Sequence, residues 1–138
     1  MTNFQSFKDL QAFIKENYGI NYNAWKGINY FSEQKTLILV SVDNVKYYRD
    51  RLDKYPIKYT AEGRIGDQNI NGYRDKKQYG NYHLFLNKDI KHIYLCRKVR
   101  KGFYSWYGEF KVCDFDEKEH PDIKGENRRI YRAYLKYV

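Results

Sequence analysis

The sequence predicts one α+β domain, in which helices flank a β-sheet. Two observations carry this prediction: an amphipathic segment of helical period opens the chain, and short β-branched or alternating segments dominate its second half. A length of 138 residues suits a single domain that buries about two thirds of the surface its unfolded chain exposes. We therefore expect one core, and the sequence contains no internal repeat or low-complexity tract.

The first half of the chain predicts one helix and two strands. Apolar residues recur at helical spacing over residues 3–17, ahead of a glycine stop signal, which predicts an opening helix. The run TLILVSV, Thr36–Val42, is β-branched and apolar and predicts a buried strand. The polar residues 47–53 can form a helical turn, which Pro56 ends before a second strand over Ile57–Thr60.

The second half predicts a long loop, a short helix and a hairpin. Residues 61–77 include three glycines and few apolar side chains, and a loop of this length in a small domain is typical of a functional loop. QYGNYHLFLNKD, residues 78–89, has the pattern of one short helix. Residues 92–99 and 103–115 then predict two antiparallel strands joined across Arg100-Lys101-Gly102.

The last part of the chain predicts a charged connector and a closing strand. Residues 116–129, DEKEHPDIKGENRR, are almost entirely polar and are expected to form a solvated connection. Residues 130–138, IYRAYLKYV, alternate apolar and charged side chains, which is the pattern of a half-buried strand.

The charge of the chain favours a polyanionic partner. Twenty-six Lys and Arg against seventeen Asp and Glu give a net charge of +9, and the pI is about 9.4. Sixteen tyrosines accompany this charge, and rings beside cations suit base stacking next to phosphate contacts, although tyrosine also fills β-structure well. Nucleic acid is therefore the leading class of partner.

Other features bear on the compartment and on cofactors. The N-terminus MTNFQSFKDLQ lacks a basic segment followed by an apolar run, so we expect a cytoplasmic chain with free thiols at Cys96 and Cys113. No apolar run reaches the length of a membrane span. The two cysteines and three histidines show no ligand spacing, so we expect neither a metal nor another cofactor.

Catalytic motifs are weak. Glu109-Phe110-Lys111 has the E-x-K form that holds a metal in many nucleases, with Asp89 as the available upstream carboxylate, and this keeps a compact nuclease as an alternative. Ser41 and Ser105 lack a glycine-rich elbow, and the glycine-rich segment after Thr60 lacks the ending of a phosphate-binding loop. We expect no catalytic residue in this domain.

Four segments in a fixed order carry a resemblance to a known family. They are YYRD at 47–50, YTAEGRIGDQ at 59–68, GN at 80–81 and YGEFKV at 107–112. In this order the chain resembles the SRA (SET- and RING-associated) domain family, and more closely the SRA-like specificity domains of bacterial modification-dependent restriction systems.

The resemblance implies a PUA-like, crescent-shaped β-barrel with flanking helices, a helix over 3–17 and the barrel with its loops over 28–138. It also implies that the domain extrudes one base from duplex DNA and holds it in a pocket. A flipped base loses stacking worth a few kcal/mol, which new aromatic faces and hydrogen bonds to its Watson–Crick edge must offset.

The family motif implies the residues of that pocket. Tyr47 and Tyr59 would supply two stacking faces. An ionised Asp50 only accepts hydrogen bonds and therefore suits the exocyclic amino group of cytosine. Thr60 would meet the remaining ring edge, while Tyr48 is the alternative stacking face if the local turn differs by one residue.

Ala61 stands where the family usually has glycine, and an alanine resists positive φ. In the alternative, purely structural interpretation, the tyrosines fill the barrel interior and Asp50 caps a helix or pairs with a neighbouring arginine.

Phosphate and groove contacts are expected from the long loop and the hairpin turn. Gln68, Asn69 or Asn71 would enter the groove to fill the gap that the flipped base leaves. The full set of expected DNA contacts is Arg64, Gln68, Asn69, Arg74, Lys76, Lys77, Lys98, Arg100 and Lys101.

The sequence therefore predicts a non-catalytic module that binds double-stranded DNA through a modified base, 5-methylcytosine or 5-hydroxymethylcytosine. It would give specificity to a restriction or defence system whose nuclease or AAA+ motor lies on another domain or subunit. The alternatives are a PUA-like RNA-binding domain in RNA modification and a small binder of nucleotide-like ligands.

Overall fold

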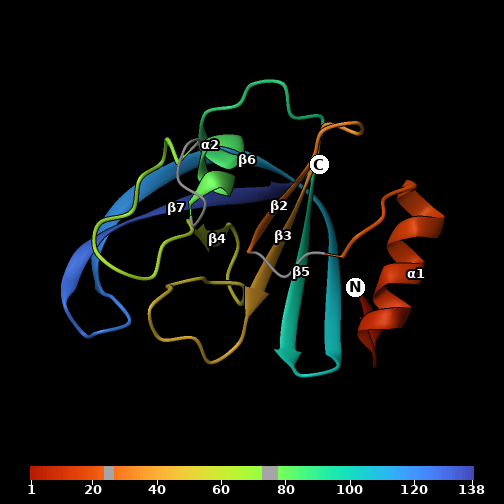
Figure 1. The fold of residues 1–138 in the computed structure, drawn as a ribbon, viewed down its shortest axis with the longest axis horizontal. Coiled ribbons are helices and arrows are strands. Elements are labelled where there is room, and N and C mark those ends of the chain that lie inside the picture. The colour runs from red at the N-terminus through yellow and green to blue at the C-terminus, as the bar shows by residue number, and fades with distance from the viewer. Residues whose placement is uncertain (24–26, 73–77) are drawn as a thin grey trace.

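A computed structural model describes residues 1–23, 27–72 and 78–138 (Figure 1). In these residues seven strands form one sheet, and two helices pack beside it. The α+β class is confirmed. The sheet order is β2-β3-β5-β6-β7-β4, with β1 paired to β6 off this path, so the sheet is curved but open between β2 and β4 in the described residues.

The opening helix begins later than its apolar pattern predicts. α1 spans Phe7–Tyr18: the side chain of Ser6 accepts a hydrogen bond from the N–H of Asp9 at 3.0 Å, and Gly19 ends the helix at φ 68°. The prediction of a start at residue 3 is wrong, because Thr2–Phe4 form β1 and pair with β6 instead.

Four strands build one half of the sheet. β2, Ile28–Phe31, was not predicted; it pairs antiparallel with β3, Thr36–Val42, whose predicted bounds are confirmed. β3 runs parallel to β5, His92–Arg100, and β5 continues antiparallel into β6, Phe103–Pro121. The carboxyl ends of β3 and β5 therefore lie at the same edge of the sheet.

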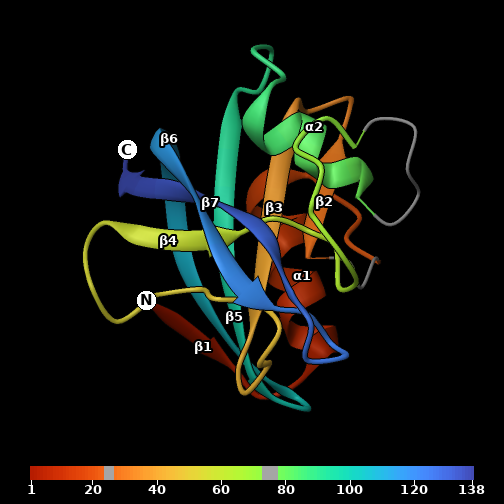
Figure 2. The same cartoon turned by 90° about the vertical axis from the view of Figure 1, so that its left-hand side faces the viewer.

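The other half is a long hairpin. β6 pairs with β7, Asn127–Tyr137, over its distal part, and β4, Ile57–Thr60, pairs with β7 on the far side. A register shift between Val112 and Asp114 marks the bend of β6, and Figure 2 shows the β6–β7 ribbon curving past the end of β4.

The predicted connector 116–129 is thus mostly strand, which corrects that expectation. Its charged side chains are stabilised across the ladder: Arg132 pairs with Asp116 at 2.8 Å and Arg129 with Glu117 at 3.1 Å. Alternating charges on an exposed ribbon lack the apolar period by which strands are usually detected.

The core has two parts, one on each face of the sheet. Alternate residues of β3 divide between them: Leu37 and Leu39 join the cluster under the short helix α2, Tyr79–Phe85, while Ile38 joins the cluster under α1. Cys96 is buried and Cys113 exposed, and both are free thiols as expected. Within the described ranges, no helix is long and apolar enough to cross a membrane.

Candidate nucleic-acid recognition site

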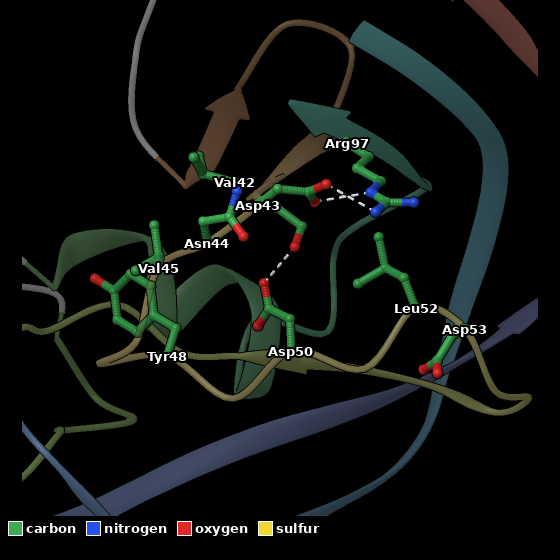
Figure 3. Close-up of a pocket in the computed structure, with 10 residues that line it drawn as sticks. Val42, Asp43, Asn44, Val45, Tyr48, Asp50, Leu52, Asp53 and Arg97 are labelled. Carbon is green, nitrogen blue, oxygen red and sulfur yellow. Dashed lines mark hydrogen bonds and ion pairs between the residues drawn. The ribbon is translucent and has the colours of Figure 1, made fainter. Parts of the chain in front are cut away.

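A polar pocket of about 350 Å³ opens where β3 ends (Figure 3). Residues of β3 and of the irregular segment 43–53 form most of it, and Arg97 of β5 joins them because β3 and β5 are parallel. The helical turn expected over 47–53 is not formed, since this segment runs along the outer edge of β4. The lining residues are Ser41, Val42, Asp43, Asn44, Val45, Tyr48, Asp50, Leu52, Asp53 and Arg97.

Asp50 links the pocket segment to both neighbouring strands. Its carboxylate accepts a hydrogen bond from the hydroxyl of Ser41 in β3 and another from the N–H of Thr60 in β4, both at 2.6 Å. Thr60 also binds the segment through its side chain, because its Oγ1 accepts a hydrogen bond from the N–H of Arg49 at 2.9 Å. These contacts hold the carboxylate at the pocket wall.

Burial raises the pKa of Asp50 above its ordinary value of 3.8, although the hydrogen bonds from Ser41 and Thr60 oppose that shift. The carboxylate of Asp50 is thus held by hydrogen bonds from neutral groups, Ser41 and Thr60, and, among the described residues, not by an ion pair at hydrogen-bond distance. Hydrogen bonds from a ligand amino group would add to those that already favour its charged form.

Tyr48 forms the aromatic part of the pocket. Its ring lines the cavity beside Val45, and its hydroxyl accepts a hydrogen bond from the N–H of Gly63 at 3.3 Å. Burial raises the pKa of this phenol. Tyr47 packs edge-on against Tyr48, with ring centroids 4.8 Å apart, and does not line the cavity. The alternative stacking residue named from the sequence is therefore the one at the pocket.

The structure places the other predicted pocket residues beneath the site. Tyr59 is 3% exposed, and its hydroxyl donates to the carbonyl of Val40 at 2.9 Å, so its ring belongs to the core. Thr60 does not line the pocket, and it contacts the pocket residue Asp50 through its N–H. Ala61 is fully buried, and its N–H donates to the carbonyl of Tyr131 at 2.8 Å.

Asp43 and Arg97 form an ion pair at the pocket rim that was not identified from the sequence. Two hydrogen bonds of 2.7 Å join the guanidinium to the carboxylate, and Figure 3 shows the two side chains turned toward each other above Asp50. These hydrogen bonds raise the pKa of Arg97. Asp43 follows a buried strand, which is a signal for a site, but its meeting with Arg97 depends on a parallel pairing that sequence patterns do not reveal.

The loop after β4 differs from expectation at one residue. Gln68 is 4% exposed; its amide donates to the carbonyls of Ala61 and Gly63, and its oxygen accepts from the N–H of Tyr131. In this structure the side chain of Gln68 closes the loop internally instead of pointing outward, as a residue that enters a DNA groove would. Asn69 and Asn71 remain exposed.

The predicted phosphate contacts fall into three groups. Arg64 is exposed on the loop after β4, and Arg100 and Lys101 are exposed at the hairpin turn, with Lys98 half-buried nearby. Arg100 lies over the ring of Phe103 at 4.8 Å. Arg74, Lys76 and Lys77 lie outside the described residues.

The nuclease motif does not converge on a metal site. Glu109 accepts a hydrogen bond from His92 at 2.8 Å, while Asp89 pairs with Lys35 at 2.9 Å. Over residues 1–23, 27–72 and 78–138, no group of three or more His, Cys, Asp or Glu side chains could hold a metal ion.

Comparison with known proteins gives matches in structure alone. No protein-family model and no curated protein sequence matches the chain. The sulfur binding domain and SRA domain of ScoMcrA, complexed with phosphorothioated DNA, aligns with a TM-score of 0.69 and 16% identity over 99% of this chain and 39% of the other. The chain has the SRA-like fold.

Two further solved structures also match the fold of this chain. The DNA modification-dependent restriction endonuclease AspBHI aligns with a TM-score of 0.63 and 16% identity, covering 84% of this chain and 63% of that one. The DNA recognition domain of the cytosine modification-dependent restriction endonuclease LpnPI gives 0.65 and 15%, covering 93% and 66%. The SRA-like chain thus spans less than two thirds of the first two structures that it matches.

Proposed function

We propose that this chain is a DNA-recognition module that rotates a modified cytosine out of the duplex and holds it beside Tyr48 and Asp50. The observation that carries the proposal is the pocket itself: an aromatic ring and an acceptor-only carboxylate share one cavity in a chain of SRA-like fold. Solved structures of that fold include an SRA domain in a complex with phosphorothioated DNA and the DNA recognition domain of a cytosine modification-dependent restriction endonuclease.

The chemistry of the pocket suits a cytosine. Extruding a base costs a few kcal/mol of stacking and pairing, and stacking on one aromatic ring returns about 1 to 3 kcal/mol. The carboxylate of Asp50 would accept a hydrogen bond from the exocyclic amino group of cytosine. A base with a carbonyl at that position would be disfavoured, because two acceptors would then face each other. The base would be 5-methylcytosine or 5-hydroxymethylcytosine.

The surface charge suits the duplex around that base. A net charge of +9 attracts a polyanion, and Arg64, Arg100 and Lys101 are exposed cations that would contact phosphates. Asn69 is an exposed polar side chain that would enter the groove. In this proposal cleavage or translocation is supplied in the cytoplasm by a nuclease or an AAA+ motor on another domain or subunit.

The test is a binding comparison by fluorescence polarisation. Labelled duplexes of one sequence would carry cytosine, 5-methylcytosine or 5-hydroxymethylcytosine at one position, and RNA of the same sequence would be measured beside them. We expect one of the modified duplexes to bind at least about tenfold more tightly than the plain duplex, a difference of about 1.4 kcal/mol.

Equal affinity for all three duplexes would refute recognition of the modification. Tighter binding of the RNA would favour the RNA-binding alternative, and binding of the free modified nucleoside without a preference for duplex would favour a small-ligand protein. Cleavage of any duplex with Mg²⁺, lost in Glu109→Ala, would reverse the assignment of a non-catalytic role.

A further inference from the structure

The tip of the β6–β7 ribbon holds the segment that carries Tyr48. His120 of β6 and Arg128 of β7 are directly opposed partners in the ladder. His120 Nε2 lies 2.7 Å from the carbonyl of Lys46, and Arg128 Nη2 donates to the carbonyl of Tyr47 at 2.6 Å. Two consecutive carbonyls immediately before Tyr48 are therefore fixed by one cross-strand pair.

The same guanidinium holds the glycine loop on the other side of Tyr48. Arg128 Nη1 donates to the carbonyl of Gly63 at 2.6 Å and to that of Gly66 at 3.2 Å. The N–H of Gly63 in turn donates to the hydroxyl of Tyr48 at 3.3 Å. Arg128 thus bridges the backbone that precedes Tyr48 and the backbone that meets the tip of its ring.

Gly63 has a conformation that only glycine adopts readily. Its φ is 123°, and an added Cβ would lie 3.0 Å from the side chain of Gln78. The carbonyls of Gly63 and Gly66 converge on one cation because of this turn, and the N–H of Gly66 is held from the ribbon by Asp122 at 3.1 Å.

The environment of Arg128 is unlike that of the other buried arginine on β7. Arg132 is 3% exposed and faces the carboxylate of Asp116. Arg128 is 4% exposed, and the hydrogen bonds of its guanidinium go to three neutral carbonyls. Burial lowers the pKa of Arg128. Burying a cation without a carboxylate in hydrogen-bond contact is unfavourable, whereas its planar fork can reach carbonyls on two separate segments.

We propose that Arg128 is a positioning residue for base recognition: it fixes the Tyr48 ring at the pocket wall by tying residues 46–47 and 63–66 to the ribbon, with His120 as the second tie. This inference rests on the proposed function, because the ring is positioned for a flipped base. Arg128 itself touches no base in this arrangement.

Arg128→Lys is the main variant, because it keeps the charge but cannot span the carbonyls of both segments. His120→Ala removes the second tie and leaves Arg128 in place. Ile14→Ala is the control: Ile14 is fully buried under α1, so this change lowers stability on the opposite face of the sheet without touching the site. If Arg128→Lys does not fold, Arg128→Gln, whose neutral amide cannot span the carbonyls of both segments, takes its place in both measurements.

The first measurement is discrimination, the ratio of Kd for plain duplex to Kd for the preferred modified duplex. We expect Arg128→Lys to reduce this ratio by about tenfold or more and His120→Ala by a smaller factor, with plain-duplex binding changed by less than about threefold. Ile14→Ala should keep the wild-type ratio. Wild-type discrimination in Arg128→Lys, or an equal loss of discrimination in Ile14→Ala, would overturn the proposal.

The second measurement needs no DNA. Hydrogen exchange of the Gly63 amide, which donates to Tyr48, should be faster in Arg128→Lys and in His120→Ala than in the wild type or in Ile14→Ala. Unchanged exchange would overturn the positioning role. If the wild type shows no discrimination at all, the proposed function fails, and this exchange result still decides whether Arg128 orders the pocket wall.

Discussion

The α1 face of the sheet and the pocket at the end of β3 are built by different chemistry. Beneath α1, Leu10 and Ile14 pack on a layer that is mostly aromatic, in which Trp106 lies against Tyr18 and Tyr94 at 5.7 Å and 5.5 Å. At the end of β3, by contrast, Asp43 and Asp50 face a cavity, and each is held by hydrogen bonds to another strand. Figure 1 shows α1 on one side of the strands and the segment between β3 and β4 on the other.

This difference separates stability from recognition. Apolar burial under α1 stabilises the fold without directional contacts, whereas the pocket depends on hydrogen bonds that orient a few side chains. Substitutions on the two sides should therefore change different measurements, and a variant that changes both would break the distinction.

The largest effect on stability is expected on the α1 side. Ile14→Ala removes a fully buried side chain and should lower the free energy of unfolding by about 2 to 5 kcal/mol. Urea denaturation measures the loss, and the ratio of affinities for modified and plain duplex should remain at the wild-type value. A change in that ratio would show that the two sides are coupled.

Asp50→Ala should give the largest effect on recognition. A hydrogen bond to a charged group contributes about 1.5 to 3 kcal/mol, so discrimination between modified and plain duplex should fall by roughly ten- to a hundredfold. The salt-dependent affinity for plain duplex should stay close to that of the wild type. If both affinities fell together, Asp50 would serve the fold alone.

Tyr48→Ala should weaken modified-duplex binding by about 1 to 3 kcal/mol, because one stacking face is lost. Tyr48→Phe is the matched control, since it keeps the ring and removes only the hydroxyl that Gly63 contacts. Fluorescence polarisation with both duplexes distinguishes the two variants. Equal losses in Tyr48→Ala and Tyr48→Phe would assign the effect to the hydroxyl rather than to stacking.

The raised pKa of Asp50 predicts a pH dependence of stability. The folded state binds this proton more tightly than the unfolded state, so the carboxyl destabilises the fold increasingly as pH rises from 3.8 through the raised pKa. Relative to Asp50→Asn, the wild type should therefore lose stability over that range. Urea denaturation of both proteins across pH 4 to 8 checks the direction, and a parallel pair of curves would contradict it.

The smallest effect is expected for Arg64→Gln on the exposed loop. Removing one phosphate contact should reduce the slope of log Kd against log salt by about 1 and weaken both duplexes alike. Asp67→Asn, an exposed neighbour of opposite charge, is a suitable comparison. A selective loss of modified-duplex binding in Arg64→Gln would place this residue at the base instead.

Strands with a clear residue pattern were predictable from the sequence. β3 and β4 have the predicted bounds, Thr36–Val42 and Ile57–Thr60, because buried β-branched runs are a strong local signal. β1 was missed because Asn3 and Phe4 were included in the apolar pattern of the opening helix, and β2 was not predicted. The strands over 103–115 and 130–138 were predicted, but their extension through residues 116–121 and 127–129 was missed because its charged residues lack an apolar period.

The candidate site was predictable in part. Tyr48 and Asp50 were found from the motif, but Arg97 and Arg128 reach the site through strand pairings between distant segments. The inward direction of Tyr59 follows from the predicted strand itself, because Ile57 and Tyr59 share one face. The family motif implies instead that Tyr59 stacks on the base, whereas the structure places its side chain in the core.

The strand pairings and hydrogen bonds around the pocket also affect how fast the protein folds and when its binding site is completed. β1 contacts β6, β4 contacts β7, and the segment carrying Tyr48 is held by Arg128, so each tie joins parts of the chain that are far apart in the sequence. Closing such large loops costs entropy before any contact compensates it, which slows folding. During synthesis the pocket segment emerges long before β7, so the binding site can be completed only after β7 has left the ribosome.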